Sequence, residues 1–323
     1  MNRLIDFNHV TKVFNDDIKA VDDISFHVPE GNIVVFLGPS GCGKTTTLRM
    51  VNRLESISEG TISVNGNSVN ELNPIELRRN IGYVIQHNGL FPNMTIEQNV
   101  MAVPDLLGWD RKKKKDRFNY LMDLVGLNPD QFRKRYPHEL SGGQQQRIGI
   151  IRAMAADPPV MLMDEPFGAL DPIIRSHIQN EFLQIQEEVQ KTILFVSHDI
   201  DEAIKMGDKV AIFREGQLMQ YDAPDEILAH PTNDFVRKFV GKDRALKSLS
   251  LHHIQDLVNE QHLNQADETN KQQKTVPIHT NLKDALSILL NQEAEQLVVQ
   301  SGDNQIGALT IQDIENYLHE KIM

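Results

Sequence analysis

The sequence predicts an α/β domain that opens with an antiparallel β layer and carries a helical insertion, followed by a small α+β unit. Four short apolar runs are typical of strands buried on both faces of a parallel sheet. Three other segments, two of which precede these runs, partly alternate polar and apolar residues, as half-buried antiparallel strands do. An almost wholly polar stretch then separates a β-α-β-β-α tail from the rest. Because the chain has 323 residues, we expect two units rather than one.

The elements follow in this order. The alternating segments of the β layer are residues 4–14, 20–28 and 61–66. The apolar runs of the parallel sheet are residues 33–37, 81–85, 160–163 and 192–197. Helical segments separate these runs, and a mostly helical insertion lies at about residues 95–155. Residues 209–222 then predict a hairpin that turns at Glu215 and Gly216.

Two boundaries divide the chain. We expect a first domain over residues 1–240, a connecting segment and polar linker over 241–274, and a small unit over 275–323. The linker is assigned from the polar run at 259–274. The small unit has too few residues to close a core alone, and the chain holds no second copy of it.

Charge and cysteine content narrow the function classes. The 33 basic and 45 acidic residues give a net charge of −12, which argues against a protein that binds nucleic acid over a broad basic face. The single cysteine, Cys42, excludes an intrachain disulfide and fits a reducing compartment. We find neither a signal peptide nor an apolar run near the ~20 residues that cross a bilayer. Any membrane role is therefore expected to go through a partner.

A phosphate-binding loop follows the first apolar run. Residues 38–46, GPSGCGKTT, match G-x-x-x-x-G-K-[ST] between a predicted strand and a predicted helix. Its glycines let successive N–H groups point at phosphate oxygens, and the helix N-terminus adds positive potential. Lys44 would bridge the β- and γ-phosphates and Thr45 would bind Mg²⁺, so we expect ATP and Mg²⁺. Cys42 is either a small filler in this loop or a thiol activated by the helix N-terminus.

Acidic residues end another predicted strand. Asp164 and Glu165 follow the run at 160–163, where Asp164 would hold Mg²⁺ and Glu165 would deprotonate the attacking water. Gln86 and His198 end the other two runs. Ligands of open α/β sheets sit at the carboxyl ends of the strands, so these groups should converge on one crevice with the loop after Leu37.

A second anion site is predicted at residues 140–147, LSGGQQQR. Ser141, Gly142 and Gly143 would present N–H groups at a helix N-terminus. Because the chain already has one phosphate loop, this site would serve the nucleotide of another chain. A plain helix start capped by Ser141 is the other interpretation.

Taken together, residues 1–240 resemble the ATP-binding-cassette (ABC) ATPases, and this resemblance implies roles for individual residues. Residues 38–46 match the Walker A motif of the family, residues 140–144 match its signature, residues 160–165 match its Walker B motif, Gln86 matches its Q-loop and His198 matches its switch histidine. These matches imply that Lys44, Gln86, Glu165 and His198 are catalytic. They also imply that Thr45, Gln86 and Asp164 hold the metal. Nucleotide contacts are implied for the Walker A loop, the signature, the D-loop of Ala169, Leu170 and Asp171, and a stacking aromatic: Phe14, Gly38, Pro39, Ser40, Gly41, Cys42, Gly43, Lys44, Thr45, Thr46, Ser141, Gly142, Gly143, Gln144 and Asp171. The resemblance also implies a head-to-tail homodimer with two ATP molecules.

Within that family, three segments most resemble importers of quaternary amines, whose substrates are glycine betaine, carnitine and choline: residues 84–100, residues 230–251 after the hairpin, and the C-terminal unit. This branch implies transmembrane permease subunits that dock at residues 87–100, a substrate-binding protein, and a location at the cytoplasmic face of the membrane. The competing hypotheses are an importer of methionine or another small solute, a soluble ABC ATPase that acts on nucleic acid or ribosomes, and a regulator whose purpose lies in the tail.

The tail resembles a single cystathionine-β-synthase (CBS) repeat, with IGALTIQDI matching the end of that motif. If it binds a regulatory adenine nucleotide, Thr310 and Asp313 match the usual ribose and phosphate contacts; a helix cap is the other interpretation. The basic run at 111–117 is interpreted as the solvated face of an amphipathic helix rather than a nucleic-acid or lipid site.

Overall fold

A computed structural model describes residues 3–15, 18–85, 89–168, 170–259, 273–291, 295–302 and 304–322. The chain divides into two compact units, Met1–Tyr221 and Asp222–Met323. The first unit thus ends before residue 240, where the sequence placed the domain boundary. Residues 222–240 hold two short helices of the second unit, α9 (Pro224–Ala229) and α10 (Asp234–Val240).

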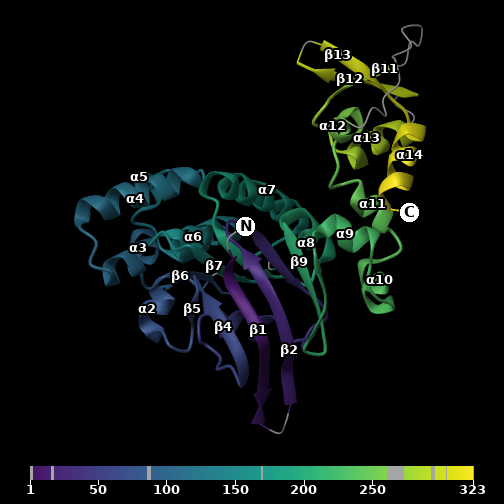
Figure 1. Ribbon diagram of the computed structural model, residues 1–323. Coiled ribbons are helices and arrows are strands. Elements are labelled where there is room, and N and C mark those ends of the chain that lie inside the picture. The colour runs from purple at the N-terminus through teal and green to yellow at the C-terminus, as the bar shows by residue number, and fades with distance from the viewer. Residues whose placement is uncertain are drawn as a thin grey trace. The chain divides into compact units, whose positions relative to one another are not determined.

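A six-stranded sheet forms the centre of the first unit (Figure 1). Its order is β10 (Gln217–Asp222), β9 (Lys209–Arg214), β3 (Ile33–Leu37), β8 (Thr192–Val196), β7 (Val160–Asp164) and β6 (Ile81–Val84). The four predicted apolar runs pair in parallel, and β3, β7 and β8 are buried along their whole length. The prediction of a buried parallel sheet is confirmed.

The predicted hairpin at 209–222 belongs to the same sheet. Its first strand, β9, pairs in parallel with β3, and β10 extends the sheet beyond it. Between them Glu215 (φ 50°) and Gly216 (φ 81°) both adopt left-handed conformations, as a tight two-residue turn requires.

An antiparallel sheet packs against the first. Its order is β2 (Ile18–Pro29), β1 (Arg3–Phe14), β4 (Glu59–Val64) and β5 (Asn67–Ser68). The core between the sheets contains stacked Phe7 and Phe26 rings, with centroids 4.3 Å apart, and the edge of Phe36 on Phe26 at 5.7 Å. Since Phe36 lies on β3, this packing fixes the strand that leads into the phosphate loop.

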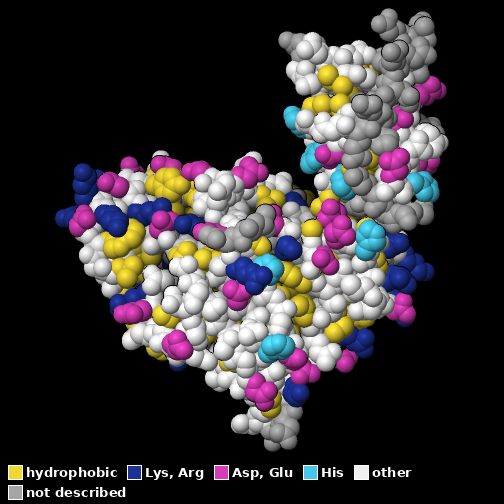
Figure 2. Space-filling view, viewed as in Figure 1, with side chains coloured by type: hydrophobic (Ala, Val, Ile, Leu, Met, Phe, Trp, Pro, Cys, Tyr) yellow, Lys and Arg dark blue, Asp and Glu magenta, His cyan; other side chains and the backbone are white. Residues whose placement is uncertain are grey.

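Helices complete the first unit. They are α1 (Lys44–Val51), α2 (Pro74–Arg79), α3 (Ile96–Leu106), α4 (Arg111–Leu124), α5 (Pro129–Phe132), α6 (Gly142–Met154), α7 (Pro172–Val189) and α8 (Ile200–Met206), with a 3₁₀ turn, η2 (Pro137–Glu139). Elements α3 to α6 form the predicted helical insertion. Helix α4 buries Phe118, Leu121 and Met122 while most of its basic residues remain exposed, and lysine and arginine side chains gather at the edge of the molecule where Figure 1 places α4 and α5 (Figure 2). The interpretation of residues 111–117 as a solvated face agrees with this arrangement.

The second unit continues with α11 (Arg244–Ser248), α12 (Ile254–Asn259), β11 (Gln273–Pro277), α13 (Leu282–Leu290), β12 (Gln296–Ser301), β13 (Asn304–Leu309) and α14 (Ile311–Ile322). Strand β12 pairs in parallel with β11 and antiparallel with β13, which confirms the predicted β-α-β-β-α order. Its core also includes Leu249, Ile254 and Leu257. These residues precede the predicted polar linker, whose residues 260–272 lie outside the described ranges, and they supply the core that residues 275–323 lack by themselves.

Within the described ranges, each helix is too short or too polar to span a lipid bilayer.

Candidate nucleotide site

The loop between β3 and α1 is held in a shape that requires glycine. Gly38 (φ 149°) and Gly43 (φ 101°) have positive φ, and a Cβ atom would lie 2.3 Å from the Phe213 carbonyl oxygen at Gly38 and 2.2 Å from the Ala20 carbonyl oxygen at Gly43. The loop is therefore pressed against β9 on one side and β2 on the other. Close backbone approach, rather than flexibility, is the reason for glycine at these two positions.

A cavity of about 290 Å³ opens beside this loop. It is lined by Ala20, Ser40, Gly41, Cys42, Gly43, Lys44, Thr45, Thr46, Glu165 and His198. Residues from three of the four predicted strand ends thus meet in one place, as expected for the carboxyl ends of strands in one parallel sheet. Gln86, at the fourth strand end, lies outside the described residues.

The Lys44 ammonium is buried at the wall of the cavity. Its Nζ donates to the carbonyl oxygens of Gly38 at 2.7 Å and Pro39 at 2.9 Å, and only 6% of the residue is exposed. A cation in this position can attract phosphate oxygens strongly, because little water screens it. The neighbouring Cys42 is also buried, and burial raises the pKa of its thiol despite the nearby Lys44. Cys42 therefore fits the filler interpretation rather than that of an activated thiol.

Asp164 and Thr45 form the oxygen pair expected for Mg²⁺. Thr45 Oγ1 donates to Asp164 Oδ1 at 2.9 Å, and Arg49 lies 4.0 Å from the other carboxylate oxygen. Burial raises the pKa of Asp164, opposed by the Thr45 hydrogen bond and by Arg49. A hydroxyl and a carboxylate are hard oxygen ligands of the kind Mg²⁺ prefers, so these residues fit the ion.

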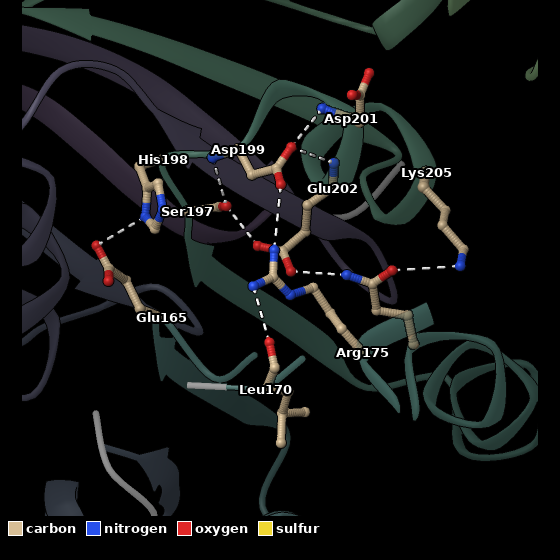
Figure 3. A network of polar contacts seen from close by, with 10 residues as sticks. Glu165, Leu170, Arg175, Ser197, His198, Asp199, Asp201, Glu202 and Lys205 are labelled. Atoms are coloured by element: carbon tan, nitrogen blue, oxygen red, sulfur yellow. Dashed lines mark hydrogen bonds and ion pairs between the residues drawn. The ribbon is translucent and has the colours of Figure 1, made fainter. Parts of the chain in front are cut away.

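Glu165 and His198 lie side by side in the lining of the cavity, with the carboxylate turned toward the imidazole (Figure 3). Glu165 has a left-handed backbone (φ 47°), held by the hydrogen bond from its N–H to the Val196 carbonyl at 3.1 Å. Its Oε1 lies 3.4 Å from Nδ1 of His198. The strained backbone turns the carboxylate out of the strand direction and toward the histidine.

Behind His198 lies a polar network that the sequence did not predict (Figure 3). Ser197 donates to Glu202 at 2.5 Å, and the other Glu202 oxygen accepts from Gln179 at 2.8 Å. Glu202 is 7% exposed, and burial raises its pKa. Arg175 pairs with Asp199 at 3.5 Å and donates to the Leu170 carbonyl at 3.0 Å. The only signal of this network in the sequence is that Glu202 follows the candidate site residue His198 by four positions.

Other predicted residues lie away from the cavity lining. Ser141 caps α6 in a reciprocal box with Gln144, and Ser141 and Gly142 are exposed. Asp171 caps α7 by accepting from Ile173 and Ile174. The Phe14 ring is 40% exposed with Lys12 Nζ 4.7 Å from its centroid. Within one chain, the described residues therefore bring the phosphate loop together with Glu165 and His198, but not with residues 141–144; Ala169 lies outside the described residues.

Comparison with known proteins gives consistent matches. A family model described as ABC transporter matches residues 21–168. The osmoprotectant import ATP-binding protein OsmV of Salmonella typhimurium is 56% identical over 80% of this chain and 69% of its own length. The glycine betaine/carnitine/choline transport ATP-binding protein OpuCA of Bacillus subtilis is 46% identical over 93% of this chain and 76% of its own. Among solved structures, a dimeric, post-hydrolysis ATP-binding cassette, MJ0796 bound to ADP and Pi, is 30% identical with a TM-score of 0.60, covering 68% of this chain and 99% of that one.

Proposed function

The chain belongs to the ABC transporter family, and on this premise we propose that it is the ATP-hydrolysing subunit of an importer of quaternary amine osmoprotectants. The observation that carries the ATPase assignment is the single cavity that holds Lys44, Thr45, Glu165 and His198, with Asp164 bonded to Thr45. The substrate class rests on the relatives, whose names specify osmoprotectant, glycine betaine, carnitine and choline transport. Methionine or another small solute is the competing cargo.

The residues of the cavity can divide the hydrolytic chemistry among them. Backbone N–H groups of residues 40–46 and the Lys44 ammonium would bind the phosphates of ATP, while Thr45 and Asp164 would hold Mg²⁺. The ion would neutralise charge on the phosphate oxygens. Glu165 would accept a proton from the attacking water, and His198 would fix the carboxylate and contact the γ-phosphate.

We propose that two chains complete the site as a head-to-tail dimer. The exposed N-terminus of α6, with Ser141, Gly142, Gly143 and Gln144, would bind the nucleotide held by the phosphate loop of the other chain. Asp171 would lie at the same interface. The dimeric state of the similar ATP-binding cassette supports this arrangement.

Permease subunits would dock at residues 87–100, and the chain would then lie at the cytoplasmic face of the membrane. An apolar pocket of about 400 Å³ lies beside the described part of this loop and includes Gly89, Phe91 and Leu106 in its lining. The exposed Phe91 ring offers a hydrophobic contact to a short helix of a partner. A substrate-binding protein would reach the chain only through these subunits.

The second unit is proposed to be regulatory, with residues 275–323 as a CBS-like repeat. Its β-α-β-β-α order supports this reading. Asp313, however, accepts from both the N–H and the hydroxyl of Thr310 at the start of α14, which forms a capping box. Both side chains therefore have the structural role that the helix-cap interpretation expects, and their contact with a regulatory nucleotide stays a prediction.

Replacing Glu165 tests the catalytic assignment. Glu165→Gln should keep ATP binding and lower the rate of hydrolysis by at least about 100-fold, since it removes the general base. Glu187→Gln, at an exposed position on α7, is the matched control and should hydrolyse ATP normally. Near-normal turnover by Glu165→Gln would refute its role.

Uptake of radiolabelled glycine betaine, carnitine and choline, by cells with and without the chain, tests the cargo. We expect uptake of at least one of the three to depend on the chain. Dependence of methionine uptake instead, or nucleic acid in place of membrane proteins after gentle purification, would favour the competing functions.

A further inference from the structure

The segments that leave β7 and β8 are tied together by one arginine. Arg175 of α7 donates to the carbonyl of Leu170, five residues after Glu165, and pairs with Asp199, the residue that follows His198. The same Asp199 uses its other oxygen to cap α8. The position of the backbone after His198 therefore depends on a side chain of α7.

A second side chain of α7, one turn further on, holds the other side of His198. Gln179 donates to Glu202, and Glu202 accepts from the hydroxyl of Ser197, the residue before His198. Ser197 in turn accepts from the N–H of Asp199 at 3.0 Å. Residues four apart lie on one face of a helix, so Arg175 and Gln179 together hold the backbone on both sides of His198. Figure 3 shows Arg175 beside Asp199, and Glu202 beside Ser197.

We infer that Arg175 and Glu202 are positioning residues for His198, which couple its contact with Glu165 to the start of α7. This inference rests on the proposed roles of Glu165 and His198. A displacement of residues 170–172, where α7 begins, would shift the Arg175 guanidinium and the buried Glu202 carboxylate. These two groups would in turn move the backbone at His198. Since Asp171 is proposed to lie at the dimer interface, closure of the dimer would adjust the histidine in the same way.

The chemistry of Arg175 separates this role from a purely structural one. Its Nε is buried and has no hydrogen-bond partner among the described residues, which costs stability. Lysine would remove that unsatisfied group but cannot reach both Leu170 and Asp199 with a planar fork. Arg175→Lys should therefore change hydrolysis more than it changes stability.

Arg117 provides a matched control. It also joins a carboxylate, Asp157 at 3.3 Å, to a backbone carbonyl, that of Met154 at 2.8 Å, but it lies on α4, outside the network. Arg117→Lys thus makes the same chemical change at the same kind of contact. It should leave ATP hydrolysis unchanged.

The test measures ATP hydrolysis by the full chain for Arg175→Lys and Glu202→Gln, each with His198 intact and with His198→Ala. We expect each variant to lower kcat about tenfold with KM for ATP changed less than about twofold, and to lower kcat less than about twofold once His198 is absent. An equal loss with and without His198, a loss confined to KM, or an equal loss in Arg117→Lys would overturn the inference. Thermal unfolding of each variant identifies a loss of folded protein, and a loss of kcat that follows the folded fraction also overturns it.

A second measurement does not depend on turnover. The ring-nitrogen NMR shifts of His198, assigned with His198→Ala, should move in Arg175→Lys and Glu202→Gln and stay in place in Arg117→Lys. Unchanged shifts in the first two variants contradict positioning. If the wild-type chain hydrolyses no ATP, the proposed function fails, whereas these shifts still decide whether the network holds His198.

Discussion

Replacement of Gly43 by alanine should destabilise the first unit more than the same replacement of Gly66, where the space beside the backbone is open. A residue with a Cβ at φ 101° leaves its favoured conformations at a cost of about 1–2 kcal/mol. The added Cβ would also lie 2.2 Å from the Ala20 carbonyl oxygen, and relieving such overpacking typically costs about 1–3 kcal/mol. The total loss for Gly43→Ala is therefore about 2–5 kcal/mol.

Gly66→Ala is the matched control, because Gly66 has a φ of 76° and a Cβ there would meet no atom within 4 Å. Gly66→Ala should lower the free energy of unfolding only by the cost of the left-handed backbone conformation, about 1–2 kcal/mol. Urea unfolding followed by the fluorescence of Trp109, the single tryptophan, reports on the first unit, and binding of a fluorescent ATP analogue reports on the loop. We expect Gly43→Ala to unfold at lower urea than Gly66→Ala and to bind ATP weakly. Equal midpoints, with ATP binding intact in both variants, would refute the argument from backbone contact.

Three further predictions concern single side chains. Because burial raises the pKa of Asp164, the contribution of this residue to folding stability is favourable at low pH and is lost as the pH rises through the raised pKa. Asp164→Asn should thus stabilise the first unit by roughly 1 kcal/mol near pH 7, with a smaller gain towards pH 4. No gain in stability at pH 7 in urea titrations would contradict this. The buried Cys42 thiol, whose pKa burial also raises, should react with Ellman's reagent at least about tenfold faster in urea than in the native chain, and equal rates would contradict its burial. Asp313→Ala should cost about 1 kcal/mol through loss of the α14 capping box, which is measured by heating the chain and following circular dichroism; an unchanged transition would show that the cap is dispensable.

The central sheet and the phosphate loop were predictable because their signals are local. Residues 193–196, for example, are all apolar, as is typical of a strand buried on both faces of a sheet. The glycine spacing from Gly38 to Gly43 likewise specifies a loop whose backbone packs closely. The convergence of Glu165 and His198 followed from a general rule for parallel sheets.

Contacts between distant segments were not predictable in this way. Nothing in the sequence near Arg175 indicates that its guanidinium meets Asp199, 24 residues away. The core of the second unit draws on Leu249 and Ile254, which a polar stretch separates from the strands they cover. The sequence pattern placed these residues in a connecting segment, because periodicity within a segment does not indicate packing between segments.

The most direct test of the account is uptake of labelled glycine betaine, carnitine and choline in cells that lack the chain and receive either the wild type or Glu165→Gln. The two proteins differ only in the proposed general base beside His198. We predict that the wild type restores uptake of at least one of these amines and that Glu165→Gln, present in equal amount at the membrane, restores none. Uptake restored equally by both proteins, or by neither, would contradict the claim that ATP hydrolysis at this cavity drives the import of quaternary amines.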